Sequence, residues 1–123
     1  MVEQASNSSN VYAYIIANSL FTPRQLSIIS KQLEGGGRPE EISSGAYYRQ
    51  IKQCRRKIVS VLYSMVLLQS TGVIHPEASS TLRKLAEQLA VIIASESSDA
   101  TSSLKVDDVT SVMDQVIKRM SKL

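Results

Sequence analysis

The sequence predicts an all-α protein built around one main domain. Aromatic residues are few (five Tyr, one Phe and no Trp), so a core must consist of aliphatic side chains, which favours helices over a sandwich or barrel. Apolar residues also recur at spacings of three and four, the period of one face of an α-helix. A chain of 123 residues is long enough to bury one such core.

The N-terminal region is expected to contain a tail and a first helix. Residues 1–9 are polar and rich in Ser and Asn, which predicts a disordered tail. A helix follows over residues 10–20, with Val11, Ile15 and Leu20 broadly on one side.

A second helix is delimited by strong local signals. Thr22 as N-cap, Pro23 at the first helical position and Gln25 at the third form a capping box, and the glycines at 35–37 end the helix. The glycine run lacks the Gly-Lys-Ser/Thr that a phosphate-binding loop requires, so we interpret it as a helix stop and hinge. Four residues supply the predicted buried side: Leu26, Ile28, Ile29 and Leu33.

A very short helix and then a long one are expected next. Residues 38–44 allow at most one or two helical turns, and Ser43 or Ser44 can cap a helix over residues 45–69 that Gly72 stops. From residue 59 this helix is apolar on nearly every side, which predicts that its second half is core, in a bundle or at an oligomer interface. An apolar stripe is predicted to face inward, formed by Tyr47, Ile51, Cys54, Ile58, Leu62 and Met65.

The C-terminal part is predicted to hold two more helices. One runs from Pro76 or the serines at 79–80 to about residue 94, and a Ser-rich linker at 95–104 separates it from a last helix at 105–123. The last helix has heptad spacing, so it either forms a dimer contact or packs on the fourth helix of its own chain. The predicted dimerisation residues are Val106, Val109, Met113, Val116 and Met120.

Positive charge is concentrated on the long helix. The net charge is +3, yet residues 42–75 contain five cations and no Asp or Glu. Three of them, Arg49, Lys52 and Arg56, fall in one sector of the helix and predict an outward cationic ridge, whereas the plain alternative is a solvated surface. Such a ridge attracts polyanions.

The order of these helices resembles a helix-turn-helix domain. Residues 21–29 (FTPRQLSII) look like the opening helix of that unit in sigma-factor region 4 and LuxR-type regulators, and residues 21–58 are similar to short archaeal helix-turn-helix domains. The interval between Gly37 and Tyr47 is shorter than in the sigma-type unit. The resemblance implies a domain over residues 10–94 that reads DNA with residues 45–58, and an archaeal or archaeal-virus source. We expect no wing, because residues 71–75 are too few for two strands.

Double-stranded DNA is therefore the expected partner, bound by a homodimer that regulates transcription or acts as a chromatin or partition factor. Arg49, Lys52 and Arg56 are expected to contact phosphates or guanine edges, with Arg55 and Lys57 beside them. Candidates for hydrogen bonds to DNA are Tyr47, Tyr48, Gln50 and Gln53. The alternative is a helical interaction module that binds an acidic protein, and attachment to an anionic membrane is a third possibility.

Other chemistry has little support in the sequence. The single cysteine, Cys54, is expected in the core rather than as a redox switch, and His75 before Pro76 is expected in a turn. No metal-ligand spacing or catalytic arrangement surrounds either residue, so we expect no enzyme activity, metal or cofactor. With no signal peptide or spanning segment recognisable, a cytoplasmic protein is expected.

Overall fold

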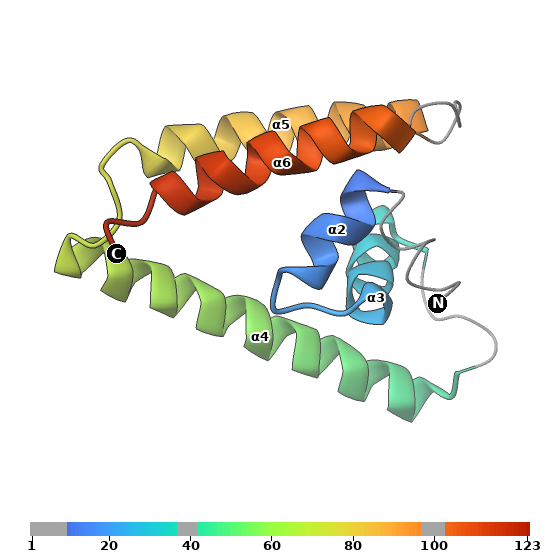
Figure 1. Cartoon of the computed structure of the whole chain (residues 1–123). Coiled ribbons are helices and arrows are strands. Elements are labelled where there is room, and N and C mark those ends of the chain that lie inside the picture. The colour runs from blue at the N-terminus through green and yellow to red at the C-terminus, as the bar shows by residue number, and fades with distance from the viewer. Residues whose placement is uncertain (1–9, 37–41, 97–102) are drawn as a thin grey trace.

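The computed structural model describes residues 10–36, 42–96 and 103–123, and confirms the all-α class (Figure 1). Within these residues there is no strand, only an isolated antiparallel bridge between Ile74 and Ser121. The described helices are α2 (Val11–Ala17), α3 (Pro23–Glu34), α4 (Ser44–Thr71), α5 (Ala78–Glu96) and α6 (Ser103–Arg119).

The predicted ends of α3 are confirmed. The Gln25 amide donates to Thr22 Oγ1 (3.1 Å) and the Thr22 amide donates to Gln25 Oε1 (3.0 Å), so the capping box closes in both directions. Gly35 ends the helix with φ of 77°, a left-handed conformation that glycine adopts without steric cost.

The long helix α4 also has the caps that the sequence predicts. Ser43 Oγ accepts a hydrogen bond from the Ala46 amide (3.2 Å), and Gly72 ends the helix with φ of 80°. Its 28 residues make it about 42 Å long. The predicted short helix at 38–44 falls largely on residues 37–41, outside the described residues, and α4 itself begins at Ser44.

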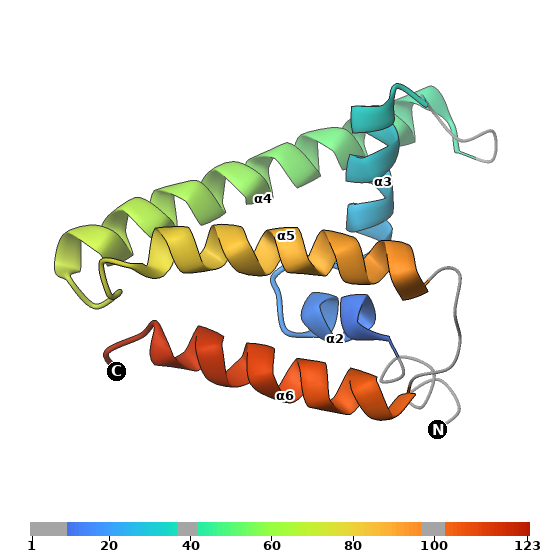
Figure 2. The ribbon, with the colours of Figure 1, turned by 90° about the horizontal axis from the view of Figure 1, so that it is seen from above.

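Two apolar clusters hold the helices together. In the first, Ile28 of α3 packs on Tyr47 and Cys54 of α4. In the second, α2 packs on both α5 and α6, and Figure 2 shows α2 between those two helices. The second cluster contains buried Val11, Val106 and Met113, with Ile15, Leu85, Leu89, Ile92 and Val109 packed against it.

The heptad seam of α6 contributes to this second cluster. Val106 and Met113 are buried against α2 and α5 of the same chain, and Val109, Val116 and Met120 are half-buried. Of the two alternatives for the seam, the structure therefore supports packing within one chain. The seam was expected to pack on α5, and the structure places α2 against it as well.

The second half of α4 differs from expectation. It was predicted to be core, but Leu62 on the predicted inward stripe and Val66 beyond it are exposed, whereas Met65 is half-buried. The reason is length, because α3 has 12 residues against 28 in α4 and packs on the stretch from Tyr47 to Cys54. The prediction of an inward stripe is correct for its first three members and wrong for Leu62 and for Ile58, which is 37 % exposed.

Several helix boundaries also differ from the predicted ones. α2 ends at Ala17 rather than residue 20, and Leu20 is exposed instead of lying on the buried side. α5 extends to Glu96 and α6 begins at Ser103, so both ends of the predicted linker at 95–104 are helical; residues 97–102 and the tail at 1–9 lie outside the described residues.

The last residues of the chain pair with the turn between α4 and α5. The His75 amide donates to Met120 O (3.0 Å) and the Lys122 amide donates to Val73 O (2.8 Å), on either side of the bridge between Ile74 and Ser121. His75 therefore lies in a turn, as predicted, and α6 is tied at its C-terminal end to the end of α4.

Candidate nucleic-acid interface

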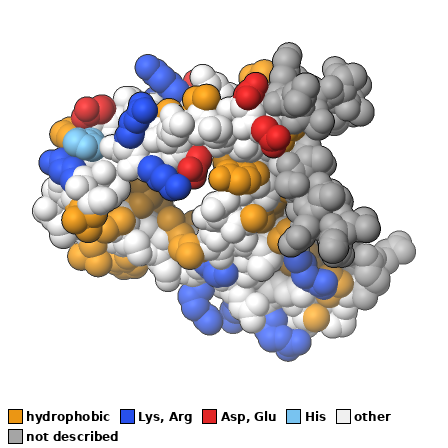
Figure 3. Space-filling view, viewed as in Figure 1, with side chains coloured by type: hydrophobic (Ala, Val, Ile, Leu, Met, Phe, Trp, Pro, Cys, Tyr) orange, Lys and Arg blue, Asp and Glu red, His pale blue; other side chains and the backbone are white. Residues whose placement is uncertain are grey.

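One face of the first half of α4 is cationic and exposed. Arg49, Lys52, Arg55 and Arg56 are all exposed and lie on adjoining turns. Figure 3 shows Lys and Arg side chains along the edge of the molecule that α4 forms in Figure 1. Below, "cationic face" means these four residues together with exposed Tyr48 and Gln53.

Two of the predicted DNA contacts lie away from this face. Tyr47 is buried, and its hydroxyl donates to Gln32 Oε1 on α3 (2.9 Å). Gln50 is half-buried, and its Oε1 has no hydrogen-bond partner among the described residues. Tyr47 therefore belongs to the packing between α3 and α4, and Gln50 is only partly accessible from the outer surface.

Lys57 has a different role from the other cations. Its Nζ donates to Leu20 O (2.7 Å) and to Gln25 Oε1 (3.3 Å), and it lies 5.7 Å from the centroid of the Phe21 ring. These contacts tie α4 to the connection between α2 and α3. Lys57 adds positive charge beside the cationic face but is held by its own chain.

The cationic face is electrostatically unopposed within the described residues. The ion pair found among the described residues lies on α6 and joins Lys118 to Asp114 (2.9 Å). The Asp114 carboxylate raises the pKa of Lys118 by hydrogen bonding and by its charge. Neither Glu77 nor any other described acid pairs with Arg49, Lys52, Arg55 or Arg56, whereas Glu40 and Glu41 lie outside the described part. The charges of the face therefore add together.

Cys54 lies behind the cationic face, in the core. It is buried, with Sγ 3.9 Å from Gln25 O. Burial raises the pKa of the Cys54 thiol, and the charge of Lys57 partly opposes that rise. A buried thiol with a raised pKa is a poor nucleophile, which agrees with the predicted core role.

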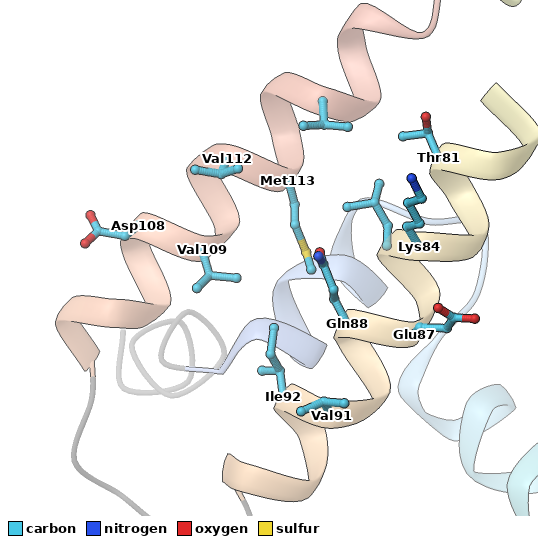
Figure 4. Close-up of a pocket in the computed structure, with 12 residues that line it drawn as sticks. Thr81, Lys84, Glu87, Gln88, Val91, Ile92, Asp108, Val109, Val112 and Met113 are labelled. Carbon is cyan, nitrogen blue, oxygen red and sulfur yellow. The ribbon is translucent and has the colours of Figure 1, made fainter. Parts of the chain in front are cut away.

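A second surface feature is an apolar groove between α5 and α6. It has a volume of about 850 Å³, and Figure 4 shows Ile92 and Gln88 of α5 opposite Val109 and Met113 of α6. Charged Lys84, Glu87 and Asp108 are also among its lining residues. In the described part of the chain, no group of three or more His, Cys, Asp or Glu side chains could hold a metal ion.

Sequence reasoning identified the cationic face but did not establish whether the apolar surface beside it is covered within the chain. After Lys57 the outward side of α4 becomes apolar, and no Asp, Glu, Lys or Arg occurs in residues 58–74. That uncharged run was interpreted as core, either of a bundle or at an oligomer interface, and the single chain leaves it exposed.

Comparisons with protein-family models, with curated proteins and with solved structures find no match for this chain. Among the described helices, none has the length and apolar character needed to cross a membrane.

Proposed function

We propose that this protein binds double-stranded DNA through the cationic face of α4. The observation that carries the proposal is the set of four exposed cations on one side of one helix, with no acidic partner among the described residues. An α-helix fits the major groove of B-DNA, and Arg and Lys neutralise the phosphates that border it.

The packing of α4 supports this role. The buried side of its first half is fixed to α3 by Ile28, Cys54 and the hydrogen bond from Tyr47 to Gln32, so the opposite side is presented by a supported helix. A rigid support lowers the entropic cost of ordering the contact residues on binding. The first half of α4 is thus held in place without using the four cations of the cationic face.

Roles can be assigned to individual side chains. Arg49, Lys52 and Arg56 follow each other at spacings of three and four, so they line one side of the helix and contact phosphates or guanine edges. Arg55 adds a further phosphate contact at the edge of the face. Exposed Tyr48 and Gln53 supply hydrogen bonds to the backbone or to bases.

Fluorescence anisotropy with a random-sequence duplex tests the proposal. Four phosphate contacts give a slope of log affinity against log salt of about −3.6 for each chain. The double variant Arg49→Glu with Arg56→Glu should lose about 100-fold in affinity at low salt, because two contacts are replaced by repulsion.

The matched control reverses two exposed cations on α5, Arg83→Glu with Lys84→Glu, which changes the net charge equally. Its affinity should stay within about threefold of the parent, since rim charges far from the contact act only through the screened long-range field. Equal losses in both variants, or a slope near zero for the parent chain, would contradict the proposal.

The alternative is a helical module whose cationic face binds an acidic protein surface. The exposed apolar half of α4 favours protein association of some kind, because large apolar patches mark such interfaces. A parent chain that fails to bind duplex yet binds an acidic protein with the same dependence on Arg49 and Arg56 would establish this alternative.

A further inference from the structure

The second half of α4 exposes a continuous apolar surface, called the apolar face below. Its large side chains are between 37 and 70 % exposed. They occupy one side of about three turns and carry no charge. The members of the apolar face are Ile58, Val59, Leu62, Tyr63, Val66 and Leu67, whereas exposed Leu68 lies on the opposite side of the helix.

The size of the apolar face is close to what a stable dimer requires. At roughly 100 Å² for each of its six side chains, the face presents on the order of 600 Å², the upper end of the range for the largest patch of a typical monomer, which is about 300–600 Å². A specific protein–protein interface of standard size buries about 800 Å² on each partner. This one helix face thus supplies about three-quarters of such an interface.

We infer that the apolar face is covered by a second copy of this chain. Because residues 58–74 contain no Asp, Glu, Lys or Arg, two copies of this face can meet without burying an unpaired charge. Contact of a surface with its own copy gives a two-fold dimer, the commonest closed assembly. Burying about 600 Å² on each chain removes the exposed Leu62, Tyr63 and Val66 from water together.

The charges of α4 fix the relative direction of the two helices. In a parallel pair the two cationic faces would lie side by side and repel each other. In an antiparallel pair centred on Tyr63, the 11 residues back to Lys52 span about 16 Å on each side, so the two cationic faces lie about 33 Å apart. That separation exceeds the screening length of about 8 Å at physiological salt, and the antiparallel pair is therefore favoured.

The antiparallel arrangement also suits the proposed binding of DNA. The match to DNA described in this paragraph rests on the proposed function, whereas the dimer itself does not. Half-sites of DNA-binding dimers lie about 34–36 Å apart, one turn of B-DNA, which matches the spacing of the two cationic faces. Arg49 and Arg56 lie roughly a quarter turn around the helix from the middle of the apolar face. A two-fold axis perpendicular to both helices therefore brings the arginines of both copies to the same side of the dimer.

The groove between α5 and α6 is a weaker dimer surface. The two most buried members of its seam, Val106 and Met113, already pack against α2 in their own chain. Its lining also includes Lys84, Glu87 and Asp108, which a second copy would have to match with opposite charges. The apolar face of α4 has neither constraint.

Two matched valine substitutions in the full chain test which surface forms the dimer. Val66 on the apolar face and Val91 in the α5–α6 groove are both 67 % exposed, so glutamate at either position should leave the fold of the monomer intact. Light scattering after size exclusion should show a parent of twice 13.5 kDa, a monomeric Val66→Glu variant and a dimeric Val91→Glu variant. Circular dichroism should show unchanged helicity in both.

Any other pattern overturns the inference. A monomeric parent removes it, and a monomeric parent that sediments with anionic vesicles would assign the apolar face to a membrane instead. Dissociation by Val91→Glu but not by Val66→Glu would move the dimer to the groove. Because Val66→Glu leaves the cationic face untouched, it should still bind duplex with the single-chain salt slope, whereas the dimer should show about twice that slope.

Disulfide trapping tests the antiparallel direction and does not depend on DNA. In a Cys54→Ala background, Tyr63→Cys should oxidise to a covalent dimer, because residue 63 meets its own copy at the two-fold axis. Val59→Cys should not, since its two copies lie about 12 Å apart along the pair, beyond the Cα separation that a disulfide spans. Cross-linking of both variants would indicate parallel helices, and cross-linking of Val59→Cys alone would refute the proposed centre.

Discussion

The two halves of α4 belong to one uninterrupted helix but differ in support and in surface chemistry. The first half is covered on one side by α3 and is cationic on the other, with Tyr47 and Cys54 buried between the helices. The second half has no comparable support, and its outward side is apolar from Val59 to Leu67. The comparison shows that a helix longer than its intramolecular partner leaves part of its apolar surface exposed within the single chain.

The largest contrast between the halves is expected in stability. Ile28→Ala should lower the free energy of unfolding by about 2–4 kcal/mol, because it opens a cavity beneath Tyr47 and Cys54. Leu62→Ala should cost less than about 1 kcal/mol when measured in the monomeric Val66→Glu background, since Leu62 is already more than half exposed. Urea unfolding of both variants in that background measures the difference, and similar losses would show that the second half is packed within the chain.

A smaller difference in stability and in DNA binding is expected between variants of two adjacent cations in the first half, Arg56 and Lys57. Lys57→Met should lower the free energy of unfolding by about 1 kcal/mol, because it removes the hydrogen bond to Leu20 O. Arg56→Met should change stability by less than about 0.5 kcal/mol but weaken duplex binding more than Lys57→Met does. Thermal unfolding and anisotropy on both variants form the test. The opposite ranking would make Lys57 the DNA contact and Arg56 the structural residue.

The smallest effect concerns the Cys54 thiol beneath the cationic face. Because burial raises its pKa, the folded state holds the thiol proton more tightly than the unfolded state does. The stabilisation is therefore complete below the thiol pKa of the unfolded chain, about 8.5, and is lost as the pH rises through the folded value. Labelling with a disulfide reagent at pH 8 should be slower for the folded protein than in urea, and equal rates would indicate an accessible thiol.

The local part of the fold could be predicted because it depends on neighbours in sequence. Thr22, Gln25 and Ser43 cap helices through bonds within three residues, and Gly72 ends α4 through its own backbone conformation. These signals fixed the helix order and the ends of α3 and α4. The end of α2 was predicted less well, because Leu20 continues its apolar pattern although the helix ends at Ala17.

The partners of each helix could not be predicted, because periodicity indicates that a face is covered but not by what. The run from Val59 to Leu68 has the composition of a core, yet it is exposed within the single chain. The seam of α6 was equally compatible with a dimer, until the structure placed α2 against Val106 and Met113. For the candidate site, residue type suggested Tyr47 as a DNA contact, whereas its position on the inward stripe correctly predicted burial.

The pairing of the C-terminal residues with the turn after α4 has a consequence for how copies of this protein meet. Extended segments with free amide and carbonyl groups invite strand-by-strand addition of other chains. Here Val73 and His75 direct those groups to Lys122 and Met120, so the extended backbone beside the end of α4 is already capped from within. Another chain therefore cannot add to this segment through the Val73 carbonyl or the His75 amide without displacing Lys122 or Met120.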